Sequence, residues 1–178
     1  MKKFLAMMMA MMMAFSMAAC GGEEAPAEEP EITMVEVNND YVTMMVPESF
    51  SDVQELEDMI GAGGEGGSFV ISDAMASDAT AADVTEDIML EMIGEAYEDV
   101  EMLEFENPMD VDGTEAVYAK LKGTDAENGV EMTLVYVMAF YMLDDVIHDQ
   151  DICITYQTGE GTDMEVCLED VIDSIRIG

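Results

Sequence analysis

Hydrophobic and polar residues alternate along several short runs of this chain, as they do in β-strands that bury one face. Two runs, 32–37 and 41–46, flank Asn38-Asn39-Asp40, which is a favourable turn sequence, and they predict a β-hairpin. Further strand-like runs, separated by turn residues, cover 68–72, 100–106, 114–121, 130–141 and 151–157. The pattern therefore predicts about six or seven strands, joined mostly as hairpins.

The run 130–141 is apolar on both of its alternating sides. Leu134 and Tyr136 fall on one side, whereas Val135 and Val137 fall on the other. A strand that is apolar on both faces is buried between two further layers. We therefore expect this strand at the centre of a sheet.

A first amphipathic helix is predicted to begin at Thr80, because Asp83 stands where a capping box places an acid. Its apolar residues recur at helical spacing, at Val84, Ile88 and Met92. Acidic residues occupy much of the remaining surface of this segment. The helix should therefore bury one face against a sheet.

A second helix closes the chain and is predicted to begin at Thr162, with Glu165 as the acid of its capping box. Arg176 lies at its C-terminal end, where a cation suits the helix dipole. The apolar stripe of this helix consists of Met164, Cys167, Leu168, Val171, Ile172 and Ile175.

These elements predict an α+β domain. Because the central strand needs cover on both faces, we expect an α/β/α sandwich, with a central, mostly antiparallel sheet of about six strands and helices on both faces. Three segments are expected outside the strands. Residues 52–60 predict a short helical turn, the glycine-rich segment 61–68 a flexible loop, and the polar run 144–150 a turn.

The first residues of the chain have the pattern of a secretory signal peptide. Lys2 and Lys3 precede an uncharged apolar run, 4–15, which is short for a transmembrane helix, and the small residues Ala18 and Ala19 follow it. The pattern predicts export from the cytoplasm.

The segment Met17-Ala18-Ala19-Cys20 resembles a bacterial lipobox, although Met17 stands where leucine is usual. The resemblance implies cleavage between Ala19 and Cys20 and a diacylglycerol thioether on Cys20. Two alternatives are an ordinary cleaved signal with an incidental cysteine, and an uncleaved anchor. Lipidation would hold the protein at the cell membrane, facing the extracytoplasmic side.

These features divide the chain into three parts. Residues 1–19 are the predicted signal peptide. Residues 20–31 are rich in Gly, Pro, Ala and Glu and predict an acidic, flexible tether. Residues 32–178 form the single predicted domain.

The net charge limits the classes of partner that the protein is expected to bind. The chain has 41 Asp and Glu residues against 5 Lys and Arg residues, a formal net charge of −36. Such a surface repels phosphate, so we expect no nucleic acid among the partners and no contact between the domain and anionic lipid. A solvated surface is one reading of this acidity, and a surface that binds cations or a basic partner is the other.

Catalytic and metal-binding patterns are weak in this sequence. His148 is followed by Asp149, but no nucleophile motif accompanies them, and we expect His148 in a solvated turn. His148, Cys153 and Cys167 lack the spacing of a zinc site. We therefore expect no enzyme activity, no metal site and no cofactor.

Two cysteines remain after the predicted lipid site. Cys153 lies on a predicted strand, and Cys167 lies on the apolar stripe of the closing helix. In an exported chain the two could form a disulfide, and two buried thiols are the alternative.

The domain resembles the PsbP-like sandwich domains, a fold also seen in a Ran-binding nuclear import factor. The resemblance is carried by Val46-Pro47-Glu48-Ser49-Phe50, by the strand 68–72 after it, by the helix from Thr80, and by the closing Asp173-Ser174-Ile175-Arg176. Phe50 stands where tryptophan is more usual. The resemblance implies a binding or assembly module, and this step is an analogy of fold.

Taken with the predicted anchor, the resemblance suggests a membrane-anchored extracytoplasmic lipoprotein that acts as a non-catalytic protein-interaction or assembly module. Its expected partners are the membrane, through the N-terminal lipid on Cys20, and another extracytoplasmic protein. The alternative is a solute- or cation-binding lipoprotein, which requires a pocket with convergent polar groups.

Overall fold

The computed structural model describes residues 32–64 and 66–178. The predicted signal peptide, the cleavage site at Ala19 and Cys20, and the tether lie outside the described residues. Strands make up 57% of the described residues and helices 16%. The strands form one sheet of eight and one of three, and every pairing is antiparallel.

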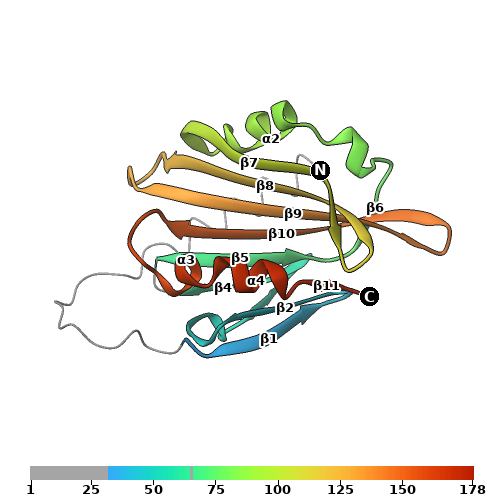
Figure 1. Ribbon diagram of the computed structural model, residues 1–178, viewed down its shortest axis with the longest axis horizontal. Helices are drawn as coiled ribbons and strands as arrows, with labels where there is room; N and C mark the ends of the chain where they lie inside the picture. The colour runs from blue at the N-terminus through green and yellow to red at the C-terminus, as the bar shows by residue number, and fades with distance from the viewer. Residues whose placement is uncertain (1–31, 65) are drawn as a thin grey trace.

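The larger sheet runs in the order β3-β4-β5-β10-β9-β8-β7, and β6 pairs with β10 beside this path. It forms the upper and middle part of the molecule in Figure 1. Its strands are β3 (Gln54–Leu56), β4 (Met59–Gly64), β5 (Gly67–Ser72), β6 (Met75–Ala76), β7 (Tyr97–Val111), β8 (Thr114–Asp125), β9 (Glu131–Leu143) and β10 (Val146–Gln157).

The smaller sheet has the order β1-β2-β11. It combines β1 (Met34–Asn39), β2 (Val42–Pro47) and β11 (Arg176–Ile177), so the two ends of the domain meet in it. The predicted hairpin is confirmed, because β1 and β2 pair throughout their length. Asp40 takes a positive φ of 48° in the turn between them.

The central position predicted for the strand at 130–141 is confirmed. β9 pairs with β8 on one side and β10 on the other, and its two faces enter separate hydrophobic clusters. Leu134 and Tyr136 belong to one cluster, and Val135 and Val137 belong to the other. All four side chains are buried.

The layers that cover the large sheet differ from the prediction. One face packs against η2 (Ala81–Asp83) and α2 (Glu86–Ile93), through residues such as Met89 and Ile93. The other face packs against the small sheet together with α3 (Asp163–Val166) and α4 (Leu168–Asp173), as Figure 1 shows.

The predicted α/β/α sandwich with a sheet of about six strands and helices on both faces is therefore wrong. The fold is mostly β, and α3 and α4 are too short to cover a face alone. Val42, Met44 and Val46 of β2 supply much of the second layer, since all three are buried in the same cluster as the two helices. The β1–β2 hairpin thus covers the part of this face that the prediction assigned to a helix.

The predicted capping box at Thr80 is present, but the helix after it is shorter than expected. The carboxylate of Asp83 accepts hydrogen bonds from the backbone N–H and the hydroxyl of Thr80, at 2.9 and 2.8 Å, and these bonds lower the pKa of Asp83. The box caps only the η2 turn. A second cap, the Thr85 hydroxyl, accepts from the backbone N–H of Ile88 and begins α2.

The closing helix is divided into α3 and α4 at Cys167, whose ψ of 8° interrupts the helical path. Its predicted cap at Thr162 is confirmed, since the Thr162 hydroxyl accepts from the backbone N–H of Glu165. The Glu165 carboxylate, predicted as the acid of a capping box, accepts instead from the backbone N–H groups of Gly159 and Gly161. The predicted position of Arg176 is also confirmed. Its guanidinium donates to the carbonyl oxygens of Asp173, the last residue of α4, and of Ile175, which follows the helix.

The glycine-rich segment is a strand pair rather than a flexible loop, and the helical turn predicted at 52–60 is absent from the structure. β3, β4 and β5 form consecutive hairpins through this region. A Cβ on Gly67 would lie 2.7 Å from the Thr155 carbonyl oxygen, and one on Gly61 would lie 2.8 Å from the Phe69 carbonyl oxygen. Glycine is therefore required here for the close approach of neighbouring strands.

Candidate functional site

The β9–β10 hairpin extends beyond the rest of the large sheet, at the right of Figure 1. Leu143 pairs with Val146, so only Asp144 and Asp145 form the turn. Both have positive φ, 50° and 64°, as a tight two-residue hairpin turn requires. The turn predicted for 144–150 is therefore wrong beyond these two residues, because the polar residues after them belong to β10.

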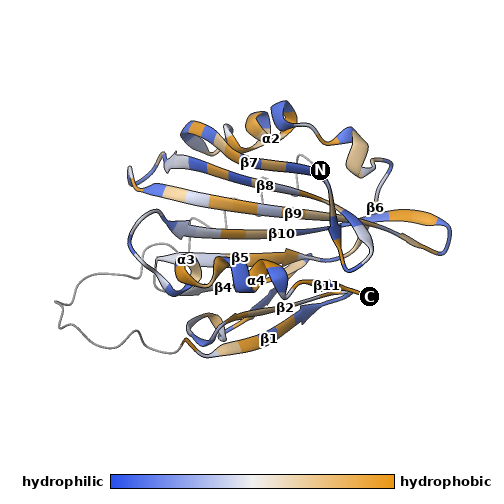
Figure 2. Ribbon diagram, viewed as in Figure 1, coloured by the Kyte–Doolittle hydropathy of each residue, from blue (hydrophilic) through white to orange (hydrophobic). Residues whose placement is uncertain are grey.

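Exposed apolar residues gather at this end of the molecule. Of the six exposed large hydrophobic residues in the described part of the chain, three lie here: Tyr41 (39% exposed), Met142 (60%) and Val146 (45%). Tyr141 and His148 lie beside them and are half-buried. Figure 2 shows hydrophobic segments along the projecting arm and a hydrophilic turn at its end. Met142 pairs with Ile147 and so points to the opposite side of the arm from Tyr141, Val146 and His148. We call Tyr41, Tyr141, Val146 and His148 the hairpin-tip patch.

Three rings form the centre of the patch. The ring centroids of Tyr41 and Tyr141 are 5.5 Å apart and tilted by 55°, and the Tyr141 and His148 rings are stacked with centroids 6.5 Å apart. Tyr41 follows β1 in the small sheet, whereas the other two come from the large sheet. The patch is therefore built where the two sheets meet.

A buried polar network fixes the central ring. The Tyr141 hydroxyl donates to Oε1 of Gln150 at 2.8 Å, and Nε2 of Gln150 donates to the carbonyl oxygens of Asn39 and Ser72, also at 2.8 Å. Asn39 in turn donates through Nδ2 to the carbonyl oxygens of Ile71 and Ser72. The Tyr141 ring is thus held in place by both sheets before any partner arrives.

Acidic residues occur in the segments that carry the patch, and one of them, Asp40, accepts a hydrogen bond from the backbone N–H of Ala74 at 3.0 Å. Asp40 precedes Tyr41, and Asp144 and Asp145 form the tip. Burial, together with the negative charge of Asp40, raises the pKa of Tyr141.

Each of the three basic residues of the described chain has a partner. Lys120 lies 3.6 Å from a carboxylate oxygen of Glu104, Lys122 lies 2.7 Å from one of Glu131, and Arg176 caps α4. Arg176 lies opposite Thr43 in the β2–β11 pair, two residues from Tyr41, so one basic residue of the described chain stands close to the patch.

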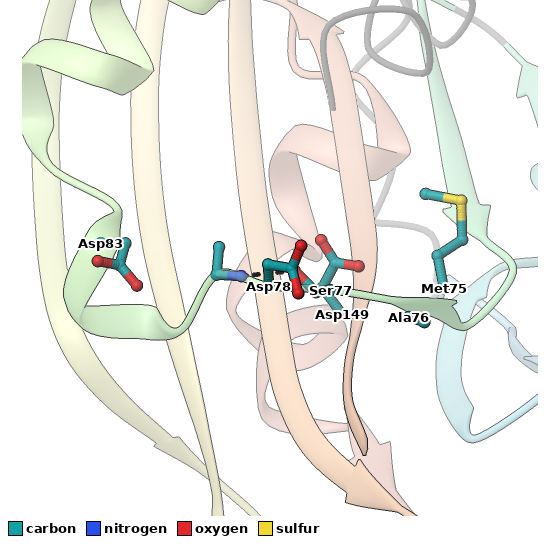
Figure 3. Close-up of a pocket in the computed structure, with 7 residues that line it drawn as sticks. Met75, Ala76, Ser77, Asp78, Asp83 and Asp149 are labelled. Carbon is teal, nitrogen blue, oxygen red and sulfur yellow. Dashed lines mark hydrogen bonds between the residues drawn. The ribbon is translucent and has the colours of Figure 1, made fainter.

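A pocket of about 550 Å³ opens near the base of the same hairpin (Figure 3). Asp149 of β10 reaches it, and burial raises the pKa of this carboxyl group, although a hydrogen bond from Ser77 opposes the effect. The close-up labels three carboxylates among the lining residues, those of Asp78, Asp83 and Asp149. The lining residues are Met75, Ala76, Ser77, Asp78, Ala79, Asp83 and Asp149.

Asp151 follows on the same face of β10 and is buried. Its Oδ1 atom has no hydrogen-bond partner within the described residues. Burial, reinforced by the negative charge of Asp149, raises the pKa of Asp151 to about 7. The interior beside the pocket therefore holds a carboxyl group that is protonated far above the usual pH.

His148, predicted in a solvated turn, lies instead on β10, where it pairs with Tyr141 of β9 and Ala76 of β6. Its Nδ1 atom lies 3.1 Å from the Val146 carbonyl oxygen. The signal that sequence reasoning missed is pairing. The polar residues after Asp145 pair with the apolar residues before Asp144. This pairing can be recognised only once the turn is known to consist of two residues.

Cys153 and Cys167 are both buried, but the structure does not bring them together. Cys153 belongs to the hydrophobic cluster beside α2, and Cys167 belongs to the cluster beside the small sheet. Burial raises the pKa of Cys153 to about 12, and the Tyr136 hydroxyl contacts this thiol. Within the described residues no group of three or more His, Cys, Asp or Glu side chains is arranged to hold a metal ion.

No protein-family model matches the chain, and no curated protein matches its sequence. Solved structures do. LpqN from Mycobacterium tuberculosis, described as involved in cell envelope biogenesis, has a TM-score of 0.53 at 10% identity over 83% of this chain and 91% of its own. The Ran-binding protein Mog1p from Saccharomyces cerevisiae has a TM-score of 0.50 at 14% identity over 83% of this chain and 96% of its own.

PA94 from Pseudomonas aeruginosa, a protein of unknown function, has a TM-score of 0.48 at 17% identity over 79% of this chain and 94% of its own. At such identities a likeness shows the fold alone. The predicted similarity to the fold of a Ran-binding factor is thus confirmed by Mog1p, although the helix-flanked sandwich is not. Among the described residues, no helix has both the length and the apolar character needed to span a membrane.

Proposed function

We propose that the protein is a membrane-anchored extracytoplasmic lipoprotein whose domain is a non-catalytic protein-interaction or assembly module. The observation that carries this proposal is the hairpin-tip patch. Two of the six exposed large hydrophobic residues of the described chain, Tyr41 and Val146, belong to it, where the projecting β9–β10 hairpin meets the turn between β1 and β2. Contiguous apolar surface on a soluble domain marks sites of interaction more often than single exposed residues do.

The fold supports the same function by analogy. One protein with this fold, LpqN, is described as involved in cell envelope biogenesis, and another, Mog1p, is described as Ran-binding. Both descriptions fit a domain that works through contacts with other macromolecules. The analogy is limited to the fold, because function resides in sites that are added to folds.

The anchor is the second part of the proposal and rests on Cys20 at the end of the apolar leader. Its test is mass spectrometry of the protein purified from the membrane fraction. We expect residues 1–19 to be absent and Cys20 to carry acyl chains, and we expect Cys20→Ser to release the protein from the membrane. A soluble protein with unmodified Cys20 would contradict the anchor and leave the interaction module untouched.

The interaction module is tested by site-specific photocrosslinking in cells. A photoreactive amino acid at Val146, which is 45% exposed in the patch, should capture a defined protein. The matched control is Val166 on α3, which is 64% exposed and lies away from the hairpin. The proposal fails if position 146 captures no protein, or captures the same proteins as position 166.

A pocket with carboxylates favours the second candidate, a solute- or cation-binding lipoprotein. Because no group of three or more metal-ligating side chains converges among the described residues, an organic cation fits better than a metal ion. Calorimetric titration with spermidine and with calcium, at fixed ionic strength, separates the possibilities. A saturable heat with spermidine that disappears in Asp149→Asn would favour this candidate, and heat from neither cation would exclude it.

A further inference from the structure

The pocket beside β6, η2 and β10 lies on the α2 side of the large sheet (Figure 3). Asp149, which lines it, stands opposite Phe140 of β9, and directly paired residues of an antiparallel sheet point to the same face. Phe140 belongs to the hydrophobic cluster beside α2, so Asp149 faces that side as well. The volume of about 550 Å³ suits a small organic molecule.

A second carboxyl group lies on the same face of β10. Asp151 follows Asp149 by two residues, which places their Cα atoms roughly 7 Å apart along the strand. Asp151 is only 8% exposed, and its Oδ1 atom has no hydrogen-bond partner within the described residues. The strand face that lines the pocket at Asp149 therefore continues into a buried carboxyl group that no cation of the described chain neutralises.

The basic residues of the described chain all lie on the other side of the large sheet. Lys120 and Lys122 of β8 stand opposite Val135 and Thr133 of β9, and Val135 belongs to the cluster beside the small sheet. Arg176 belongs to the small sheet itself. Within residues 32–64 and 66–178, no lysine or arginine thus lies on the pocket side, and a positive charge there has to come from a ligand.

The lining indicates the class of that ligand. Asp83 already accepts two hydrogen bonds from Thr80, which leaves the carboxylates of Asp78 and Asp149 for a ligand. The apolar part of the lining consists of Met75, Ala76 and Ala79. An aliphatic polyamine matches both parts, because its ammonium groups pair with carboxylates and its methylene groups contact apolar side chains.

We infer that the pocket binds an aliphatic polyamine, with an ammonium group against Asp149, and that Asp151 releases a proton to the solvent when the polyamine binds. A positive charge close to a buried carboxyl group favours its ionised form. In the unliganded protein burial raises the pKa of Asp151 to about 7, so the group still holds its proton at pH 6. This inference rests on the second candidate function and adds the ligand class and the pH dependence to it.

Several other titratable groups surround Asp151. Tyr136 of β9 and Cys153 of β10 lie on the same face, and burial raises the pKa of both, that of Cys153 to about 12, so neither loses a proton near neutral pH. Asp78 and Asp83 face the pocket from the segment after β6. His148 precedes Asp149 on the opposite face of β10, where it pairs with Tyr141, and needs a control of its own.

The test is calorimetric titration of the full chain, in neutral detergent and at fixed ionic strength, with spermidine. Each titration is run in two buffers that differ in their enthalpy of ionisation, because the difference in heat counts the protons released. We expect about one proton released per spermidine at pH 6 and almost none at pH 8, with an affinity about tenfold higher at pH 8. Calcium should release no proton at either pH.

Matched variants assign the proton and the binding site. Asp151→Asn should still bind spermidine, but with no proton released at pH 6 and equal affinity at the two pH values. Asp149→Asn should weaken binding about tenfold or more at both pH values, whereas Asp87→Asn on the exposed surface of α2 should leave it unchanged. His148→Gln should keep the proton release of the parent. The proton count of the parent is itself decisive if Asp151→Asn does not fold.

Two results would overturn the inference and leave the second candidate function standing. They are saturable spermidine binding that releases no proton at pH 6, and a proton release that persists in Asp151→Asn. Equal weakening by Asp149→Asn and Asp87→Asn would show general attraction to an acidic surface and would remove both. No saturable heat with spermidine at either pH would also remove the polyamine site.

Discussion

Asp151 places its carboxyl group in the interior beside β10, where burial raises its pKa to about 7 from the ordinary value of 3.8. Between these two pH values the folded state holds the proton more tightly than the unfolded chain does. The folded state therefore loses stability as the pH rises through this window, and the loss is complete once the pH exceeds the folded-state pKa. Below the unfolded pKa the group makes no difference.

Substitution of this residue tests that behaviour. Asp151→Asn removes the titration, so the free energy of unfolding should fall less between about pH 5 and about pH 8 than in the parent, by an amount on the order of a few kcal/mol. Urea unfolding at both pH values measures it. Asp87→Asn, which is exposed on α2, should follow the parent. Parallel pH curves for the parent and Asp151→Asn would show that the Asp151 carboxyl group does not titrate in this range.

The side chain of Asn39 joins the two sheets. Its Nδ2 atom donates to the carbonyl oxygens of Ile71 and Ser72, at 3.1 and 2.9 Å, and to Asp73 at 2.9 Å. Asn39→Ala should lower the free energy of unfolding by about 1–3 kcal/mol, because partly buried acceptors lose their donor. Asn38→Ala is the control, since Asn38 is exposed on the same strand. Similar effects for the two variants in urea unfolding would contradict the assigned role.

At the scale of elements, the hairpin of β4 and β5 depends on glycine for contact rather than for flexibility. Gly67→Ala would place a methyl group 2.7 Å from the Thr155 carbonyl oxygen on β10, and should destabilise the protein by about 1–3 kcal/mol. Gly178→Ala meets nothing within 4 Å and should be neutral. Thermal unfolding of both variants measures the difference, and an unchanged melting temperature for Gly67→Ala would show that the strands can separate to admit a side chain.

Elements whose hydrophobic residues recur with a regular period could be predicted from the sequence. Elements that depend on contacts with distant residues could not. The β1–β2 hairpin and the doubly buried β9 follow from alternation, which depends only on the local sequence. The glycines of β4 and β5 carry no side chain and hence no periodic signal, so their strands were read as a loop. Thr80 and Thr85 both offer caps, and the choice between them depends on packing.

Few ion pairs within the described residues offset the negative charge of the molecule. Two ion pairs are formed within the described residues, at Lys120 and Lys122, against a formal net charge of −36 for the full chain. Repulsion between the remaining carboxylates opposes the compact state, and salt screens it because the Debye length falls from about 30 Å at 0.01 M to about 3 Å at 1 M. The melting temperature should therefore rise by several degrees over this range.

The measurement compares sodium chloride with calcium chloride at equal ionic strength. Equal increases in melting temperature would agree with screening alone, and a larger increase with calcium would indicate specific cation sites. A melting temperature that does not change with salt would mean that the carboxylates are spaced widely enough to act independently.

The candidate site could not be predicted from the sequence, because residues from distant parts of the chain form it. Tyr41 and Tyr141 are far apart along the chain and become neighbours only through the packing of two sheets. Met142 lies just after the predicted strand 130–141, and Val146 lies in the run 144–150 that was predicted as a turn, so the sequence did not indicate the long β9–β10 arm on which both are exposed. His148 was singled out from the sequence, but as a turn residue rather than as part of a ring stack.

The tight turns of this protein have one further consequence. Every non-glycine residue with a positive φ in the described part of the chain is an aspartate: Asp40, Asp99, Asp112, Asp144 and Asp145. Asparagine suits this backbone conformation as well as aspartate does, so geometry alone does not explain the choice. At these turns the number of acidic residues can thus be changed independently of folding, by natural variation or by design. The strands between the turns stay unchanged.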